Sequence, residues 1–482
     1  MEEATSERII SDPIYGRVKL PSVCVEIMDT MHFQRLRFVK CLGITDFVYP
    51  SGVHSRFTHS IGVAYLAGKC VKRLKKKQPE LGITAQDVLA VQIAGLCHDL
   101  GHAPFSHTFE SDFLPAAAGE DKQWTHEDNS VRVFLHMLHN EPSIYKTVLS
   151  ILDNTDITFI CEAIKPDLNA SIGSWSYKGR SKEKAFLYEI IANKNTGIDV
   201  DRFDYIRRDA YYIGIPVNFD LNRLLDNMMV AEFDGQKRIV FLEKVKLDVQ
   251  ALFYTRKELH SRVYQHKTVK LIHEMLVEAL LLADPFVEIH FGDAGRTATL
   301  SESAYNVEPF LNSTDCIFEN ILYSTKESLQ PARRLLQRIV TRNLFRIVCS
   351  MKLTSEEMAN LSQLSNAEER DACLLKRLII KCVRSESISP PESLNDDMVL
   401  TVARVQFKEE INENGIVTVP FYNPKIRKLT SEQIQVLAPD KSAMVVHVYS
   451  KSNEQSCREC IAYSCRKWCQ KFKLSQNVEM YS

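Results

Sequence analysis

The segment from Thr84 to Gly101 constrains the fold most strongly, because its pattern predicts both the bounds and the surroundings of one helix. Thr84 is a favoured N-terminal cap, and Asp87 lies where the second residue of a capping box belongs. Apolar residues at helical spacing follow, and Gly101 can take the left-handed conformation that ends helices. We therefore expect His98 and Asp99 to lie in the last turn of a buried helix.

A buried histidine and aspartate need partners, since an unpaired charge in an apolar interior is costly. Seven of the 14 histidines lie between residues 32 and 126, His59 among them, and Asp201 follows in the segment GIDVDRFDY. Two imidazoles and two carboxylates suit Fe, Mn, Ni or Zn, or Mg at weaker affinity. The alternative is a set of unrelated core or surface histidines. The order of His59, His98-Asp99 and Asp201 favours a shared metal site.

The rest of the sequence predicts a mainly α-helical fold with a smaller C-terminal α+β lobe. A segment rich in Ser, Pro and acidic residues, 386–397, is typical of a linker between a domain of residues 1–385 and a lobe of residues 398–482. Helical spacing in the larger domain is strongest over residues 22–42, 58–77, 124–139, 200–212, 251–283 and 330–348.

Within the lobe the pattern changes to alternation, which predicts strands at 403–407 and 416–419 joined by a turn at Asn414-Gly415. A helix after Thr430, a strand at 443–449 and a helix at 454–472 complete the prediction. The last helix holds four cysteines, and structural zinc ligands usually come from separate elements, so we do not expect zinc there.

Composition excludes several classes of protein. Sixty basic and 61 acidic residues give a net charge of -1, and the run KRLKKK at 72–77 is more often a solvated helix end than a nucleic-acid patch. Neither a signal peptide nor a long apolar span is present, so we expect a soluble protein with no membrane association. The 13 cysteines are an odd number scattered through apolar segments, which is typical of an intracellular protein.

The motif H…HD…D, followed by HDLGHAPFSH, resembles the HD-domain hydrolases. The further segments DPIYGRVKL, RFTHSIGVAYLAG, GIDVDRFDY and YQHK resemble the vertebrate SAM-and-HD-domain deoxynucleoside triphosphate triphosphohydrolases, from residue 8 to about 346 and more weakly to about 475. This resemblance implies hydrolysis of a dNTP to deoxynucleoside and triphosphate by an HD domain within residues 1–385. Because only about a dozen residues precede the DPIYG segment, we expect the family's SAM domain to be absent.

The resemblance also implies roles for individual residues. The metal, Fe, Zn or Mn with Mg in addition, would be bound by His59, His98, Asp99 and Asp201. His107 would protonate the leaving 5′ oxygen, and Glu110, where the family usually has Asp, would keep it protonated. The phosphates would be contacted by Arg56, His102, His126, Arg202 and Arg256.

For the sugar, Tyr205 and Asp209 share one helical face with Asp201 and would meet the deoxyribose, Asp209 at its 3′-hydroxyl. Tyr264 would exclude a ribose 2′-hydroxyl, Leu42 would pack on the sugar, and His260 would line the same pocket. Cys41 is a departure from the family's Gln. A thiol is a poor hydrogen-bonding group, so we expect either weaker sugar binding or compensation by another group.

A regulatory layer is implied as well, in which GTP and dNTP activators bridge subunits into a homotetramer. Asp29, Gln34 and Arg37 would bind a guanine, with Arg8 near its phosphates. Leu242 stands where the family has a base-contacting Arg. A second, deoxynucleotide activator would be bound by Arg223, Lys244, Lys267, Arg342 and Arg346. Ordinary surface charge is the alternative for all of these. The resemblance further implies a nuclear, and also a cytoplasmic, protein of dNTP catabolism and antiviral defence.

Two other functions remain open from the sequence. An HD protein can instead hydrolyse cyclic nucleotides, nucleoside monophosphates or guanosine tetraphosphate alarmones. The second alternative is a protein that binds single-stranded nucleic acid and whose HD site is vestigial. The presence of all four metal-ligand candidates disfavours the latter.

Overall fold

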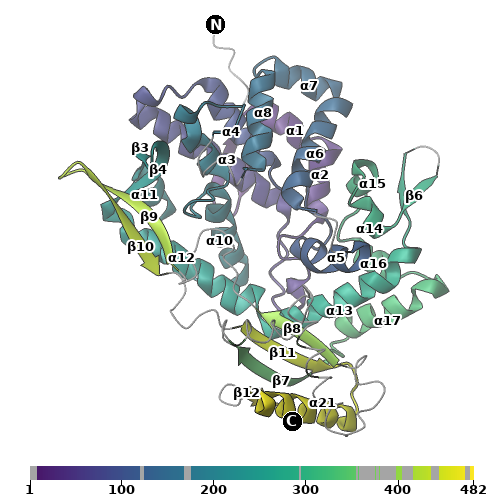
Figure 1. Ribbon diagram of the computed structural model, residues 1–482. Helices are drawn as coiled ribbons and strands as arrows, with labels where there is room; N and C mark the ends of the chain where they lie inside the picture. Colours follow the sequence, from purple (N-terminus) through teal and green to yellow (C-terminus); the bar gives the residue numbers. More distant parts are fainter. Residues whose placement is uncertain are drawn as a thin grey trace.

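The computed structural model describes residues 8–119, 124–167, 175–292, 295–353, 398–403, 416–435, 444–472 and 478–481, with the single residues 357, 375 and 379. Helices form most of the molecule, and a sheet with one helix against it lies at the lower end (Figure 1). This arrangement confirms a mainly α-helical fold with a smaller C-terminal α+β lobe. None of the described helices has both the length and the apolar character that crossing a bilayer requires.

The helical body is built around three long helices, α3 (Arg56–Lys77), α4 (Ala85–Cys97) and α10 (Val200–Ile213). The other helices are α1 (Ser22–Met28), α2 (Met31–Gln34), α5 (Leu114–Ala118), α6 (His126–Asn140), α7 (Pro142–Leu149), α8 (Asn154–Ile164), α9 (Tyr188–Ile191), α11 (Leu221–Asp226), α12 (Lys246–Leu259), α13 (Lys267–Ala283), α14 (Leu300–Ser303), α15 (Val307–Leu311), α16 (Ile317–Leu322), α17 (Gln330–Val340) and α21 (Gln455–Lys471).

Helix α4 confirms the prediction made from its caps. The Thr84 hydroxyl accepts from the Asp87 amide at 3.0 Å, and the Asp87 carboxylate accepts from the Thr84 amide at 2.9 Å. Every residue from Asp87 to Cys97 is buried, so the helix runs through the core. His98 caps the C-terminal end, and Asp99 follows directly.

Three of the predicted helices are shorter or divided. Residues 22–42 form two short helices and a 3-10 turn in place of one helix. The predicted helix 251–283 is divided by a π turn at His260–Tyr264, which carries two of the expected pocket residues. The predicted helix 330–348 ends at Val340, because Arg342 has a left-handed φ of 59° and the chain then enters a strand.

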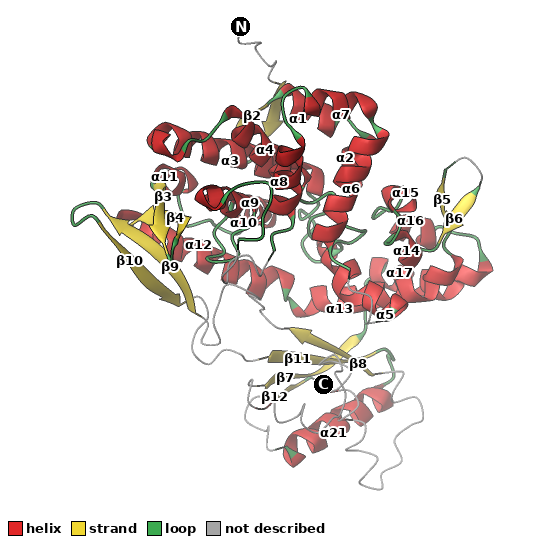
Figure 2. Cartoon of the chain, turned by 45° about the horizontal axis from the view of Figure 1, so that its top comes forward, coloured by secondary structure: helices red, strands yellow, loops and turns green. Residues whose placement is uncertain are grey.

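Within the part of the chain that the structure describes, the strands form four small antiparallel or mixed sheets (Figure 2). Two are two-stranded, β1-β2 and β5-β6, and two are four-stranded, in the orders β10-β9-β4-β3 and β12-β7-β11-β8. The strands are β1 (Arg8–Asp12), β2 (Gly16–Leu20), β3 (Met228–Phe233), β4 (Gln236–Leu242), β5 (Ile289–Phe291), β6 (Arg296–Ala298), β7 (Arg346–Leu353), β8 (Met398–Ala403), β9 (Ile416–Asn423), β10 (Lys428–Gln435), β11 (Met444–Ser450) and β12 (Val478–Met480).

The helix predicted after Thr430 is wrong, because residues 428–435 form β10 and pair antiparallel with β9. This register places buried Ile434 opposite buried Val417, and that contact decides the local structure. The predicted strands at 416–419 and 443–449 and the helix at 454–472 are confirmed. The predicted turn at Asn414-Gly415 and most of the strand at 403–407 lie outside the described residues, as does the linker 386–397.

Strand pairing joins segments from both sides of that linker. β9 pairs in parallel with β4, and β7 pairs with β11 and β12. Helix α21 packs against the sheet that contains β7, where the Trp468 side chain is fully buried in a second hydrophobic core. The lobe is therefore tied to the helical body by its backbone hydrogen bonds as well as by its covalent connections.

Candidate active site

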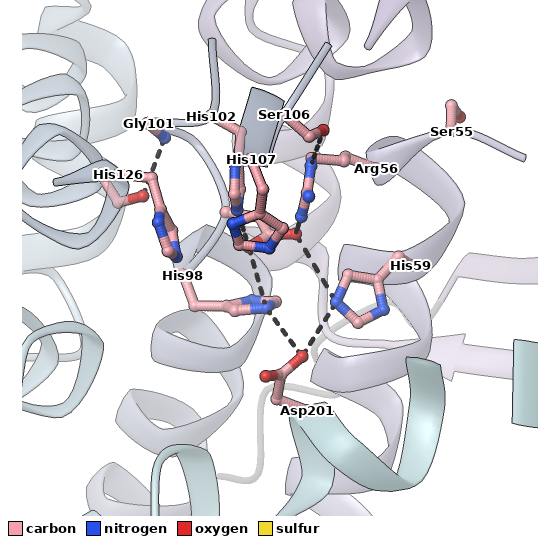
Figure 3. A network of polar contacts seen from close by, with 12 residues as sticks. Ser55, Arg56, His59, His98, Gly101, His102, Ser106, His107, His126 and Asp201 are labelled. Carbon is pink, nitrogen blue, oxygen red and sulfur yellow. Dashed lines mark hydrogen bonds and ion pairs between the residues drawn. The ribbon is translucent and has the colours of Figure 1, made fainter. Parts of the chain in front are cut away.

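Three of the predicted metal ligands, His59, His98 and Asp201, point toward one another (Figure 3). The fourth, Asp99, contacts both histidines. Asp201 Oδ1 lies 3.1 Å from His59 Nε2 and 3.5 Å from His98 Nε2. The Asp99 carboxylate lies 3.3 Å from His98 Nε2 and 3.6 Å from His59 Nε2. Metal–ligand bonds of about 2.0–2.2 Å place neighbouring ligand atoms about 3 Å apart or slightly more. His59, His98 and Asp201 each offer an atom within 4.8 Å of the other two and so can share one ion, and Asp99 lies between this group and His102 and His126, with which it forms a second such group.

The imidazole rings of His98 and His59 are also oriented as a divalent cation requires. His98 Nδ1 is 2.9 Å from the Gly95 carbonyl oxygen, which leaves Nε2 facing the carboxylates. That Nε2 is buried and has no hydrogen-bond partner among the described residues, as expected of an atom that ligates a metal. His59 Nδ1 lies 2.8 Å from Asp204 Oδ2, the outer contact that metal-binding imidazoles usually make.

The charges of the site favour cation binding. Burial alone would raise the pKa of Asp99, but neighbouring Arg56 and the imidazoles hold it well below its usual value. The pKa of Asp201 is likewise held low, against the effect of burial, by His59 and His98. Both carboxylates are therefore ionised. Burial would lower the pKa of His59, yet hydrogen bonds to Asp201 and Asp204 raise it to about 10, so a cation that binds there displaces a proton.

Three further imidazoles form a cluster beside the metal ligands. The His102 and His126 rings stack at 3.9 Å, and His107 meets them edge-on at 5.1 and 5.5 Å. Glu110 contacts His126 Nδ1 at 2.7 Å but lies 3.8 Å from His107 Nδ1. The Glu110 carboxylate, in the π turn Phe109–Phe113, therefore faces both imidazoles and makes its closer contact with His126; its role in keeping His107 protonated stays a prediction.

The loop between α4 and this cluster is held in an unusual backbone conformation. Phe105 and Ser106 have φ values of 59° and 55°, which side-chain-bearing residues rarely adopt. The Phe105 amide donates to Asp315 at 2.7 Å, and the Ser106 hydroxyl donates to the Lys40 carbonyl at 2.8 Å. These buried contacts fix the loop that presents His107.

Arg56 lies deeper than expected of a phosphate ligand. Its Nη1 contacts Asp99 Oδ2 at 2.5 Å, and its Nε donates to the Ser106 hydroxyl at 2.8 Å. The guanidinium thus binds a metal ligand and the strained loop in this structure, and its phosphate role stays a prediction. Arg202 forms an ion pair with Asp199, the N-cap of α10, because the cap residue lies one turn before it.

A cavity of about 670 Å³ opens beside the metal ligands, within the size range of small-molecule sites. All of the predicted metal and substrate residues line it, and so do His102, His107 and His126; Glu110 stands behind them. Sequence reasoning gave no signal for several other polar lining residues: Thr45, Thr108, Lys194, Asp199, Gln265, Lys270 and His273.

One wall of the cavity is organised around Asp209. Its carboxylate accepts a short hydrogen bond from the Tyr264 hydroxyl and lies 2.7 Å from His54 Nε2. The His54 ring in turn stacks on Tyr212 at 4.6 Å. Sequence reasoning missed His54, although it is the first histidine of HSRFTHS. Burial raises the pKa of the neighbouring Cys41 well above its usual value, so its side chain is a neutral thiol.

The residues predicted to bind activators lie outside the cavity. The first set clusters at the α1–α2 corner: Arg8 Nη1 is 3.2 Å from Asp29 Oδ2, and Arg37 Nε donates to Gln34 Oε1 at 2.6 Å. In the second set Arg223 donates to the Lys244 carbonyl at 2.8 Å, and Arg342 donates to the Phe47 carbonyl at 2.7 Å. Lys267 lies over the Tyr481 ring, while Arg346 begins β7 and Leu242 ends β4.

The sequence of this chain is similar to those of known proteins. The HD domain family matches residues 56–206. The deoxynucleoside triphosphate triphosphohydrolase SAMHD1 of Danio rerio is 40% identical over 474 residues, which cover 96% of this chain and 74% of that protein. The protein of the same name from Homo sapiens is 38% identical over 473 residues, covering 96% and 73%. A homolog of SAMHD1 from Dictyostelium discoideum is 38% identical over 355 residues, covering 73% and 62%.

Proposed function

This chain belongs to the family of HD-domain deoxynucleoside triphosphate triphosphohydrolases, and from that premise we propose that it converts a dNTP and water into a deoxynucleoside and triphosphate. One observation carries the proposal. His59, His98, Asp99 and Asp201 converge on the wall of a cavity that also presents cationic side chains and the Asp209–Tyr264 pair. In this proposal the metal ligands serve the reacting phosphate, the cationic side chains serve the other phosphates, and the Asp209–Tyr264 pair serves the sugar.

Arginine and histidine side chains bind the triphosphate in this proposal. Arg202 and Arg256 lie close enough that the positive charge of Arg202 is one cause, after burial, of the lowered pKa of Arg256. An anion between two guanidiniums relieves such repulsion, and guanidiniums fit phosphate oxygens in pairs. His126 adds positive charge, because Glu110 raises its pKa against the effect of burial.

The bond that breaks joins the α-phosphorus to the 5′ oxygen. A divalent cation bound by the four ligands would supply a Lewis acid that lowers the pKa of a water and offsets phosphate charge. His107 donates the proton that the departing 5′ oxygen requires, since it is the most exposed of the three clustered imidazoles, with 67% of its side chain accessible. Asp209 accepts a hydrogen bond from the 3′-hydroxyl, and the Tyr264 ring occupies the space that a 2′-hydroxyl would need.

Regulation by GTP and by a dNTP, through a homotetramer, is part of the same proposal. The exposed guanidinium and carboxylate groups of Arg8, Asp29 and Arg37 offer donors and acceptors for a guanine nucleotide at one corner of the helical body. The second activator would be bound where Arg223 and Lys244 meet. A nuclear or cytoplasmic role in dNTP catabolism and antiviral defence follows from the family alone.

The experiment is incubation of the pure protein with Mg²⁺ or Mn²⁺ and each dNTP, with and without GTP, followed by ion-exchange chromatography. We expect equal amounts of deoxynucleoside and intact triphosphate, and GTP should accelerate their release. The double variant His98→Ala, Asp99→Ala should release neither. Production of a deoxynucleoside monophosphate and pyrophosphate would contradict the proposal.

The same assay separates the alternative functions. Cyclic nucleotides, nucleoside monophosphates and guanosine tetraphosphate should remain intact under conditions in which dNTPs disappear. A scaffold that binds single-stranded nucleic acid would show binding that falls steeply with salt and survives the His98→Ala, Asp99→Ala change.

A further inference from the structure

A buried chain of polar contacts extends from the metal site to the N-terminal hairpin. Its first link is the 2.8 Å contact between His59 Nδ1 and Asp204 Oδ2. Arg208 donates to both oxygens of Asp204, from Nε at 2.8 Å and from Nη2 at 3.0 Å. The same Nη2 lies 3.0 Å from Asp12 Oδ2. Four side chains thus connect the first β-hairpin to a metal ligand.

The side chains that make these contacts are buried, so each charge depends on its partner. Asp204 and Arg208 have no exposed surface, and Asp12 is 6% exposed. Buried charged groups are costly unless each has a partner, so the loss of one partner leaves the next charge uncompensated. The guanidinium of Arg208 serves two carboxylates, and its fixed fork holds the Asp204 carboxylate in one orientation.

The local sequence keeps space for this chain. A Cβ at Gly62, one turn after His59 on α3, would lie 1.9 Å from Asp204 Oδ1 and 2.6 Å from Arg208 Nη2. Only glycine at this position lets α10 bring its carboxylate and guanidinium against α3. At the other end, Asp12 Oδ1 accepts from the amides of Ile14 and Tyr15 at 2.8 and 3.0 Å and closes the turn between β1 and β2.

We propose that Asp12 is a positioning residue of the metal site, acting through Arg208 and Asp204 to hold His59 Nε2 toward the cation. The hairpin is therefore part of the metal centre, although its strands lie outside the cavity. The inference rests on the metal site of the proposed function and not on the identity of the nucleotide. β1 also contains Arg8, so a ligand that moves this strand acts on cation affinity through the same contacts.

The test compares Asp12→Asn, which keeps an oxygen for the two turn amides but removes the charge facing Arg208, with Asp12→Glu, which keeps the charge. The matched control is Asp226→Asn, which breaks an exposed ion pair with Arg73 on α3. Mn²⁺ affinity is measured by isothermal titration calorimetry on the full chain without nucleotide, at a temperature well below the melting point of every variant. Thermal melting with and without Mn²⁺ gives a second readout.

We expect Asp12→Asn to weaken Mn²⁺ binding, by less than the about 10- to 100-fold that follows loss of a direct partner of a metal ligand, because Asp12 acts on His59 through Arg208 and Asp204. Asp12→Glu should recover part of the affinity, Asp226→Asn should match the wild type, and Mn²⁺ should raise the melting temperature of Asp12→Asn less than that of the wild type. Wild-type affinity in Asp12→Asn would overturn the inference, and so would an equal loss in Asp226→Asn. If Asp12→Asn does not fold, Gly62→Ala is titrated instead, and unchanged Mn²⁺ affinity there would also overturn it. Failure of the proposed function would show in the product assay alone and leave these affinities unaffected.

Discussion

The cavity and the α1–α2 corner both match the family residue by residue, the cavity more specifically than the corner, and their side chains differ in burial. In the cavity two metal-ligand candidates have partners that hold their rings: Asp204 behind His59 and the Gly95 carbonyl behind His98. At the corner, the ion pair between Arg8 and Asp29 joins side chains that are 57% and 58% exposed. Such surface pairs contribute little to stability.

The two regions therefore differ in how their residues are positioned: those of the cavity by packing within the chain, and those of the corner mainly by surface contacts. Packing of α3, α4 and α10 brings the candidate metal ligands together within this chain, and the free energy of burial holds them in place. The corner residues are more exposed, and their contacts include the Arg8–Asp29 pair, the Gln34 bonds to Arg37 and the Met28 carbonyl, and the Arg37 guanidinium on the Phe57 ring. We predict that they act on the reaction only when a ligand or a second copy of the chain joins them. The contrast therefore predicts large effects of substitutions in the cavity and conditional effects at the corner.

Substitution of the metal ligands should have the largest effect. His98→Ala with Asp99→Ala removes two of four ligands, and loss of several kcal/mol of transition-state stabilisation lowers the rate by about a thousandfold or more. The measurement is triphosphate release under saturating dNTP, with the exposed His139 of α6 changed to Ala as the control. Removal of the cation from the wild type by a chelator should give the same loss, reversed by Mn²⁺. Retained activity in the double variant would contradict the prediction that substitutions in the cavity have larger effects than those at the corner.

The Asp209 wall should give the next largest effect. Asp209→Asn weakens charge-assisted hydrogen bonds of about 1.5–3 kcal/mol, so kcat/KM for dNTPs should fall about 10- to 100-fold. Tyr264→Ala should raise the activity on ribonucleotides relative to deoxynucleotides, because it vacates the space beside the 2′ carbon. Steady-state kinetics on dGTP and GTP as substrates decides both, with exposed Tyr211→Phe of the same helix as the control. If Tyr264→Ala leaves the ratio of ribonucleotide to deoxynucleotide activity unchanged, Tyr264 does not select the sugar.

At the α1–α2 corner the effect should appear only with an activator. Arg37→Ala removes a donor for guanine, and a coupling free energy of about 1–3 kcal/mol corresponds to a loss of about 5- to 150-fold in GTP stimulation. The quantity measured is the ratio of rates with and without GTP. Substitution of the exposed Lys75 of α3 by Ala is the control. A full GTP response in Arg37→Ala would mean that this corner is ordinary surface charge.

The smallest expected effect is at Cys41. Its neutral thiol lines the cavity beside Leu42, and Cys41→Gln adds an amide that can hydrogen-bond the sugar. One such bond is worth about 1 kcal/mol, so KM for dNTPs should fall about threefold to fivefold. The same substitution should leave the GTP stimulation ratio unaltered. No change in KM would show that another group already compensates for the thiol.

The sequence predicts that the candidate metal ligands meet, and this prediction is possible because its information is local. A capped, apolar helix that ends in His98-Asp99 places the pair in the core, and that burial calls for partners. Asp204 was missed because nothing in GIDVDRFDY distinguishes it from Asp201; its role depends on how α10 packs against α3. The helix predicted after Thr430 failed for the same reason, since pairing with β9 overrides local propensity.

The direction of attack tests the central claim most directly. When a dNTP is hydrolysed in water enriched in oxygen-18, attack at the α-phosphorus places the label in triphosphate and leaves the 5′ oxygen of the deoxynucleoside unlabelled. The geometry of the cavity predicts one labelled oxygen per released triphosphate, measured by mass spectrometry. Label in the deoxynucleoside, or in a deoxynucleoside monophosphate released with pyrophosphate, would contradict the account.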